Sequence, residues 1–186
     1  MLILASGSPR RRELLAQIGV TFQVVVSEVE ECQQAATPAE LVVVNARAKA
    51  LAVAAQYPQQ VVLGADTVVA VDGRIFGKPR DAADAARMLT QMQGRSHEVV
   101  TGLALVRDGQ VHTDAVSTTV TFSPMTPAQI ESYVATGEPL DKAGAYAVQG
   151  RAAAYIERID GSYSNVVGLP LHALYVLAER AGIKLL

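Results

Sequence analysis

Short β-rich runs alternate with helical segments along the chain, and this alternation constrains the fold more than any other feature. The first example is the strand-like run at 2–5, followed by the breaker Ser6-Gly7-Ser8-Pro9 and a helical pattern over 10–18. Strands and helices that mix in this way pack as an α/β domain with helices on the faces of the sheet. The sequence therefore predicts an α/β fold built on a twisted sheet.

Turn and capping residues place the other elements. Thr37-Pro38-Ala39-Glu40 and Thr126-Pro127-Ala128-Gln129 are typical helix starts, with helices expected to about Gln56 and to Gly137. Asp72-Gly73 and Asp108-Gly109 are typical hairpin turns. Residues 28–31, 138–150 and 161–168 are expected to be loops or turn-rich connections. We further expect strands at 21–26, 61–65, 68–71, 97–107, 110–122 and 152–159, and helices at 81–92 and 171–181.

Composition and charge exclude several classes of protein. With 186 residues, 50% of them hydrophobic, the chain is long enough for one globular domain spanning 1–186. The formal net charge of −2 argues against binding of nucleic acid by bulk charge. No run approaches the roughly 20 apolar residues of a membrane span, and the N-terminus lacks a signal-peptide core. We therefore expect a cytoplasmic protein with no nucleic-acid or membrane partner.

Three arginines at the start of the first helix break a local rule. The positive end of a helix dipole disfavours cations, yet Arg10, Arg11 and Arg12 follow the expected cap Ser8 and Pro9 directly. Free backbone N–H groups and guanidinium forks together suit a phosphate chain. Since successive helical residues point about 100° apart, at most two arginines can converge, and Arg10 and Arg11 are preferred. The alternative is a solvated basic turn.

Asp66 is the strongest candidate for acid–base chemistry. It follows a buried apolar run, where a carboxylate needs a cation, a metal or several donors. It is therefore a candidate base or metal ligand, with a turn aspartate as the alternative. Glu28, Glu30 and Glu31 could each supply a second oxygen ligand for Mg²⁺ or Mn²⁺, although an exposed charge is the ordinary role of such residues.

Two lysines could reach a phosphate. Lys49 lies among small apolar residues of the long helix, so its ammonium either binds a partner or extends to water. Lys78 is held between Gly77 and Pro79, which suits a fixed point charge. Zinc, P-loop and GxSxG motifs are all missing, and the three histidines are expected to be surface or structural groups.

Five segments together resemble the Maf family of nucleoside triphosphate pyrophosphatases. They are ASGSPRRRELL at 5–15, GADTVV at 64–69, GKPRDAADA at 77–85, TGEPLDKAGAYAVQG at 136–150 and GSYSNVVGLPL at 161–171. The resemblance implies a mixed α/β fold with two lobes around a central cleft, similar to inosine triphosphate pyrophosphatases, and a homodimer.

The resemblance also implies a reaction and a set of site residues. The reaction is hydrolysis between the α- and β-phosphates of a nucleoside triphosphate, with a divalent cation (Mg²⁺, Mn²⁺ or Co²⁺) that we expect Glu31 and Asp66 to hold. Asp66 corresponds to the general base of the family. The positions that the family uses for substrate choice correspond here to Arg10, Thr67 and Gln149. The polar residues of the family's cleft correspond to Ser6, Arg11, Glu31, Lys49 and Lys78.

One of the segments that resemble the family indicates which nucleotides are the expected substrates. DKAGAY followed by QG is similar to the branch acting on dTTP and UTP, so pyrimidine triphosphates are the expected substrates. Ala147 and the run Arg151-Ala152-Ala153 replace glycines usual in that region, and each added β-carbon can narrow the backbone and shift Gln149. Two alternatives are a non-catalytic nucleotide-binding regulator of septum formation and cell division, and a hydrolase that removes only the γ-phosphate.

Overall fold

The computed structural model describes residues 1–186 and divides them into two compact units. The first unit comprises Met1–Thr67, Thr101–Val116 and Gly168–Leu186, and the second comprises Val68–Val100 and Ser117–Val167. Three strands, β3, β5 and β6, contribute residues to both units. This division agrees with the expected two lobes, whereas the central cleft and the assignment of 1–186 to one domain stay predictions.

The strands form one mixed sheet, which confirms the predicted fold class. Their order is β2-β1-β3-β5-β6-β7, with β4 paired to β3. β1 runs parallel to both β2 and β3, whereas the β3–β4 and β6–β7 pairs are antiparallel. The strand bounds are β1 Leu2–Leu4, β2 Phe22–Val24, β3 Val61–Val71, β4 Arg74–Phe76, β5 Ser96–Arg107, β6 Gln110–Phe122 and β7 Ile156–Asp160.

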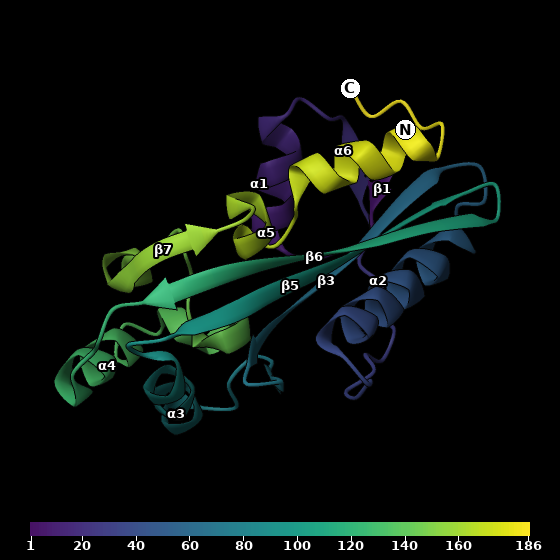
Figure 1. The fold of residues 1–186 in the computed structure, drawn as a ribbon. Helices are drawn as coiled ribbons and strands as arrows, with labels where there is room; N and C mark the ends of the chain where they lie inside the picture. The colour runs from purple at the N-terminus through teal and green to yellow at the C-terminus, as the bar shows by residue number, and fades with distance from the viewer. The chain divides into compact units, whose positions relative to one another are not determined.

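Helices of the first unit cover both faces of its strands (Figure 1). Helix α2 lies on one face, and α1 and α6 lie on the other. Their bounds are α1 Pro9–Gln17, α2 Pro38–Ala54 and α6 Leu171–Arg180. In the second unit, α3 and α4 contact each other and pack into its core. The remaining helices are α3 Ala82–Met92, α4 Pro127–Val134, α5 Tyr163–Val167 and the 3-10 segments η1 Glu138–Asp141, η2 Ala143–Ala145 and η3 Arg151–Tyr155.

Two strand glycines let α2 lie against the sheet backbone. A β-carbon on Gly64 would come within 2.2 Å of the carbonyl oxygen of Ala46, and one on Gly102 within 2.4 Å of the carbonyl group of Val42. Ala46 and Ala50 add little bulk on the helix side, and both are fully buried. Because protein interiors are close-packed, larger residues here would force the helix away from the strands.

The helix and hairpin signals are confirmed. The Thr37 side chain accepts a hydrogen bond from the Glu40 backbone, and Thr126 forms a full capping box with Gln129. Both expected Asp-Gly turns have positive φ at both residues, with φ of 48° at Asp72 and 50° at Asp108. No helix of the structure combines the length and the apolar character needed to cross a membrane.

Several sequence-based assignments differ from the structure. The separate strands at 61–65 and 68–71 are one strand, because Asp66 and Thr67 continue the pleat instead of interrupting it. The strand expected at 152–159 begins only at Ile156, because the alanine-rich start favours a helical turn over extended backbone. The connection at 161–168 contains the short helix α5.

Candidate active site

Three residues predicted for the site, one basic and two acidic, lie together in the first unit. Asp66 lies in β3, Lys49 in α2, and Glu31 in the segment between β2 and α2. Lys49 Nζ lies 2.8 Å from Asp66 Oδ1 and 2.7 Å from Glu31 Oε1. The Asp66 side chain is 10% exposed, whereas that of Glu31 is 49% exposed and reaches solvent. One ammonium thus bridges the two carboxylates that the sequence predicts as metal ligands.

Asn45 is a further member of this cluster, and sequence reasoning missed it. Its Nδ2 donates to Asp66 Oδ2 over 3.1 Å and to the Cys32 carbonyl over 3.1 Å. Its Oδ1 accepts from the Cys32 backbone N–H over 2.8 Å. Asn45 therefore fixes both the Asp66 carboxylate and the chain next to Glu31. The available signal was its spacing: it lies four residues before Lys49, so both side chains occupy one face of α2.

The donor set can hold a cation. Glu31 and Asp66 already share the ammonium of Lys49, so both carboxylates reach one positive charge. No three His, Cys, Asp or Glu side chains are grouped so that they could hold a metal ion by themselves. The two carboxylates therefore fit a magnesium-like ion only if phosphate oxygens and water complete its coordination, which is the usual way that proteins bind Mg²⁺ with a nucleotide.

Arg11 lies in a second polar cluster on the other face of β3. Its Nη1 donates to Ser6 Oγ over 3.1 Å and to the Ala65 carbonyl over 3.0 Å. Its Nη2 donates to Thr67 Oγ1 over 3.0 Å, and its Nε to the Gly168 carbonyl over 2.8 Å. A guanidinium has five N–H donors. Four of them are therefore used within the protein, which leaves Arg11 little capacity to bind a phosphate directly.

Arg11 is half-buried, and charged groups lie near it. Burial lowers the pKa of the Arg11 guanidinium, and the nearby carboxylates of Asp66 and Glu31 act in the opposite direction. Arginine nevertheless stays charged because its ordinary pKa is so high. The Arg11 guanidinium therefore links α1, β3 and the chain at Gly168 through hydrogen bonds. We call this set of contacts the Arg11 brace. Ser6 and Thr67, which the sequence predicts as substrate contacts, are both acceptors of this brace.

The start of α1 matches the sequence-based expectation only in part. Ser8 is the N-cap and Pro9 the first helical residue, but the Ser8 side chain makes no capping bond. Instead the Ser8 backbone N–H donates to Ser6 Oγ over 3.3 Å. Arg12 is exposed, as predicted for the third arginine, and Arg10 is half-buried. An anion site at this helix start stays a prediction.

The second unit contains the two other predicted substrate residues. Lys78 is exposed in the loop after β4, and Gln149 is exposed in the segment between η2 and η3. Their contact with a ligand stays a prediction. His97, expected to be a surface or structural group, is 3% exposed and its Nε2 hydrogen-bonds to the Tyr146 hydroxyl over 2.7 Å, so it is structural.

Comparisons with known proteins find close relatives. A family model described as "Maf-like protein" matches residues 1–181. The dTTP/UTP pyrophosphatase of Symbiobacterium thermophilum is 57% identical over 182 residues, covering 97% of this chain and 94% of that protein. That of Gloeobacter violaceus is 57% identical over 180 residues, covering 96% and 95%. The solved structure of the Staphylococcus aureus Ham1 protein aligns with a TM-score of 0.49 at 15% identity, covering 97% and 98%.

Proposed function

The chain belongs to the Maf family, and on that premise we propose that it hydrolyses dTTP and UTP to the nucleoside monophosphate and pyrophosphate. The observation that carries the proposal is the cluster of Asp66, Lys49 and Asn45, in which a buried carboxylate is held at both oxygens. Relatives that are more than half identical over nearly the whole chain bear the name dTTP/UTP pyrophosphatase.

Asp66 is the proposed general base. A carboxylate has about four acceptor positions, and Asn45 and Lys49 occupy one on each oxygen. The others stay open to a water molecule. Asp66 takes a proton from this water while the oxygen attacks phosphorus, the α–β anhydride bond breaks, and pyrophosphate leaves. Because two donors fix the carboxylate beforehand, little reorganisation is needed when the proton moves.

Glu31 and Asp66 would hold the divalent cation together with phosphate oxygens. When bound, this cation would neutralise phosphate charge and make the attacking water more acidic. Lys49 keeps the two carboxylates beside each other in the free protein, at the distances given above. Arg10, in the first turn of α1, and Lys78, in the loop after β4, are the proposed direct phosphate contacts, and each supplies a positive charge.

The Arg11 brace changes the role proposed for that residue. Since most of its donors are used internally, Arg11 acts on the substrate through Thr67 and Ser6, which it orients. Thr67, Arg10 and Gln149 are the proposed determinants of base and sugar choice. Of these three residues, Thr67 is held in place by its hydrogen bond from Arg11.

Release of pyrophosphate from dTTP tests the proposal. We expect the purified protein with Mg²⁺ or Mn²⁺ to form dTMP and pyrophosphate, and Asp66→Asn to lose at least about 100-fold in kcat, the usual contribution of a general base. Glu131→Gln, which alters an exposed carboxylate of α4 outside the proposed site, is the matched control and should keep parental turnover. Formation of dTDP and inorganic phosphate would indicate removal of the γ-phosphate, and binding without turnover would indicate a regulator.

A further inference from the structure

Gln149 lies in a tight turn of the second unit. The Gly150 N–H donates to the Ala147 carbonyl over 3.0 Å, which closes a four-residue turn over 147–150. Val148 is buried within this turn, and Gln149 is exposed. Ala147 is not among the residues with positive φ, so its β-carbon fits the turn without strain. The turn therefore presents the Gln149 amide from a defined backbone.

Two side chains outside the turn bind both of its ends. The Ala147 N–H donates to the Tyr133 hydroxyl over 3.3 Å. The Arg151 N–H donates to Glu138 Oε1 and Oε2, each over 3.1 Å. The Tyr133 hydroxyl in turn donates to Glu138 Oε1 over 2.7 Å. Tyr133 and Glu138 are therefore one connected pair that holds the turn before and after Gln149.

The glycine of the turn fits this pair. A β-carbon on Gly150 would lie 2.3 Å from Glu138 Oε1 and 2.5 Å from Oε2, so the carboxylate occupies the space of a side chain. Gly150 has a φ of −106°, which any residue can adopt. A side chain at this position would therefore meet the Glu138 carboxylate, whereas the backbone conformation itself does not call for glycine.

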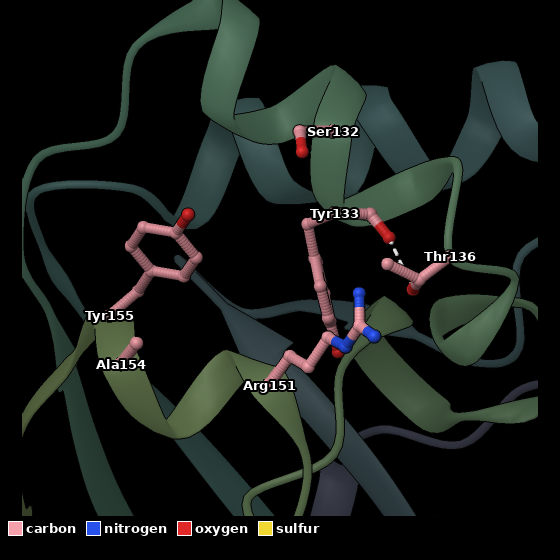
Figure 2. A pocket seen from close by; sticks show the side chains of 6 residues that line it. All are labelled: Ser132, Tyr133, Thr136, Arg151, Ala154 and Tyr155. Carbon is pink, nitrogen blue, oxygen red and sulfur yellow. Dashed lines mark hydrogen bonds between the residues drawn. The ribbon is translucent and has the colours of Figure 1, made fainter.

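Tyr133 and Glu138 are themselves held firmly. Tyr133 is 3% exposed, and burial and the Glu138 carboxylate both raise the pKa of its hydroxyl, which stays protonated and able to donate. Thr136 Oγ1 donates to the Tyr133 carbonyl over 2.6 Å and accepts from the Glu138 N–H over 3.2 Å. Figure 2 shows the Tyr133–Thr136 bond and the Arg151 side chain beside the Tyr133 ring.

We propose that Tyr133 and Glu138 are positioning residues for nucleotide selection, because they fix the turn that presents Gln149. The inference rests on the proposed function, in which Gln149 takes part in choosing the base. An exposed amide discriminates between bases only if its backbone is held in one arrangement. The pair supplies that restraint with hydrogen bonds at the two ends of the turn and with the carboxylate against Gly150.

The first test compares two tyrosines of the same pocket. Tyr133→Phe removes the hydroxyl that binds both Ala147 and Glu138, whereas Tyr155→Phe removes a hydroxyl that makes neither bond. Both tyrosines line one pocket of about 360 Å³ (Figure 2). Tyr133→Phe should lower the ratio of kcat/KM for dTTP to that for dGTP by about 2- to 10-fold, the worth of the neutral hydrogen bond that the turn loses at the Ala147 N–H. Tyr155→Phe should keep the parental ratio.

Hydrogen exchange separates positioning from general loss of stability. In Tyr133→Phe the backbone N–H of Ala147 should exchange faster, while amides of β1 keep parental rates. A parent protein without turnover would overturn the proposed function and the inference with it. A parent that turns over dTTP, alongside a Tyr133→Phe variant with a loosened turn and unchanged selectivity, would overturn the inference alone.

A double-mutant cycle tests the contact with Gly150. Gly150→Ala should reduce the selectivity ratio in the parent, because the new methyl group displaces the Glu138 carboxylate. In a Glu138→Ala background the same substitution should have less than about a twofold effect, because the contact is already lost. Equal effects in both backgrounds would show that Glu138 does not act through the turn, and the inference would be wrong.

Discussion

The side chains of Asp66 and Thr67, neighbours in β3, point to opposite faces of the strand. Asp66 accepts hydrogen bonds from Lys49 and Asn45 of α2, whereas Thr67 accepts one from Arg11 of α1. This follows from the alternation of side chains along a strand. The proposed base and a proposed selectivity residue are therefore joined by a single peptide bond, and each is held by a different helix.

Replacing Arg11 by lysine should weaken the fold. Arg11→Lys retains the charge but cannot reach four acceptors with one ammonium. We expect a loss of about 3 kcal/mol in the free energy of unfolding, since hydrogen bonds from charged donors are strong. Urea denaturation measures this loss. Arg12→Lys, at an exposed position, should differ little from the parent, and equal stability of the two variants would contradict the brace.

Replacing Asn45 by aspartate should place a second negative charge beside Asp66. Asn45 Nδ2 now donates to Asp66 Oδ2, and in Asn45→Asp that donor becomes a carboxylate. We expect the free energy of unfolding at pH 7 to fall by about 3 to 5 kcal/mol, as for other uncompensated buried charges. Asn45→Ala, which adds no charge, should lose about 1 to 3 kcal/mol.

The pH dependence of this difference gives a second measurement. Protonation of one carboxyl group removes the repulsion, so the gap between Asn45→Asp and Asn45→Ala should narrow as the pH falls from 7 to 5. Chemical denaturation across this range reports the gap directly. A gap that stays constant with pH would mean that the two carboxylates do not interact.

His97 should make the protein less stable in acid. Burial lowers the pKa of His97 from 6.5 to about 4, and its Nδ1 has no hydrogen-bond partner in the structure. Between these values the unfolded chain binds the proton and the folded protein does not, so stability falls as the pH drops through this window. The shift corresponds to about 3 kcal/mol.

A phenylalanine variant isolates this contribution. His97→Phe should be less stable at pH 7, because it loses the bond to Tyr146, but its stability should depend less steeply on pH between 6.5 and 4. His172→Gln, on the exposed face of α6, should retain the parental slope. Parallel slopes for the parent and His97→Phe would exclude His97 as the titrating group.

Adding a methyl group at Gly64 should push α2 away from the sheet. The nearest atom to the new β-carbon would be the Ala46 carbonyl oxygen at 2.2 Å, and backbone cannot move aside as a side chain does. We expect Gly64→Ala to cost about 3 kcal/mol of stability and to reduce dTTP turnover. Gly77→Ala, where the β-carbon would meet nothing within 4 Å, is the stability control. A parental melting temperature for Gly64→Ala would refute the close contact.

Much of the fold was predictable because its signals are local. Caps at Thr37 and Thr126 and the two Asp-Gly turns act through neighbouring backbone groups, so the residues themselves specify them. The sequence predicts a break between strands at Asp66 and Thr67, because only their contacts with α2 and α1 make these polar residues acceptable in mid-strand. The homodimer and the cytoplasmic location stay predictions.

Three residues of the proposed site could be predicted to lie together, whereas the partners of other residues could not. The resemblance pointed to Asp66, Lys49 and Glu31, which the structure brings together. It also suggested that Arg11 contacts the substrate, whereas the structure shows most of its donors bound to the protein. Asn45 could not be predicted from a motif, because an amide in an apolar helix carries none, and its role comes from the hydrogen bond to Asp66 of the strand packed against the helix.

The bare backbone at Gly64 also sets the reach of the chemistry. Gly64 and Asp66 lie two residues apart on the same face of β3. The distance between α2 and the strand at Gly64 therefore sets the distance between Lys49 of α2 and Asp66. A substitution at Gly64, which is not one of the proposed site residues, can therefore lower turnover. Any redesign of this enzyme should treat the absence of a side chain at Gly64 as part of the geometry of the site.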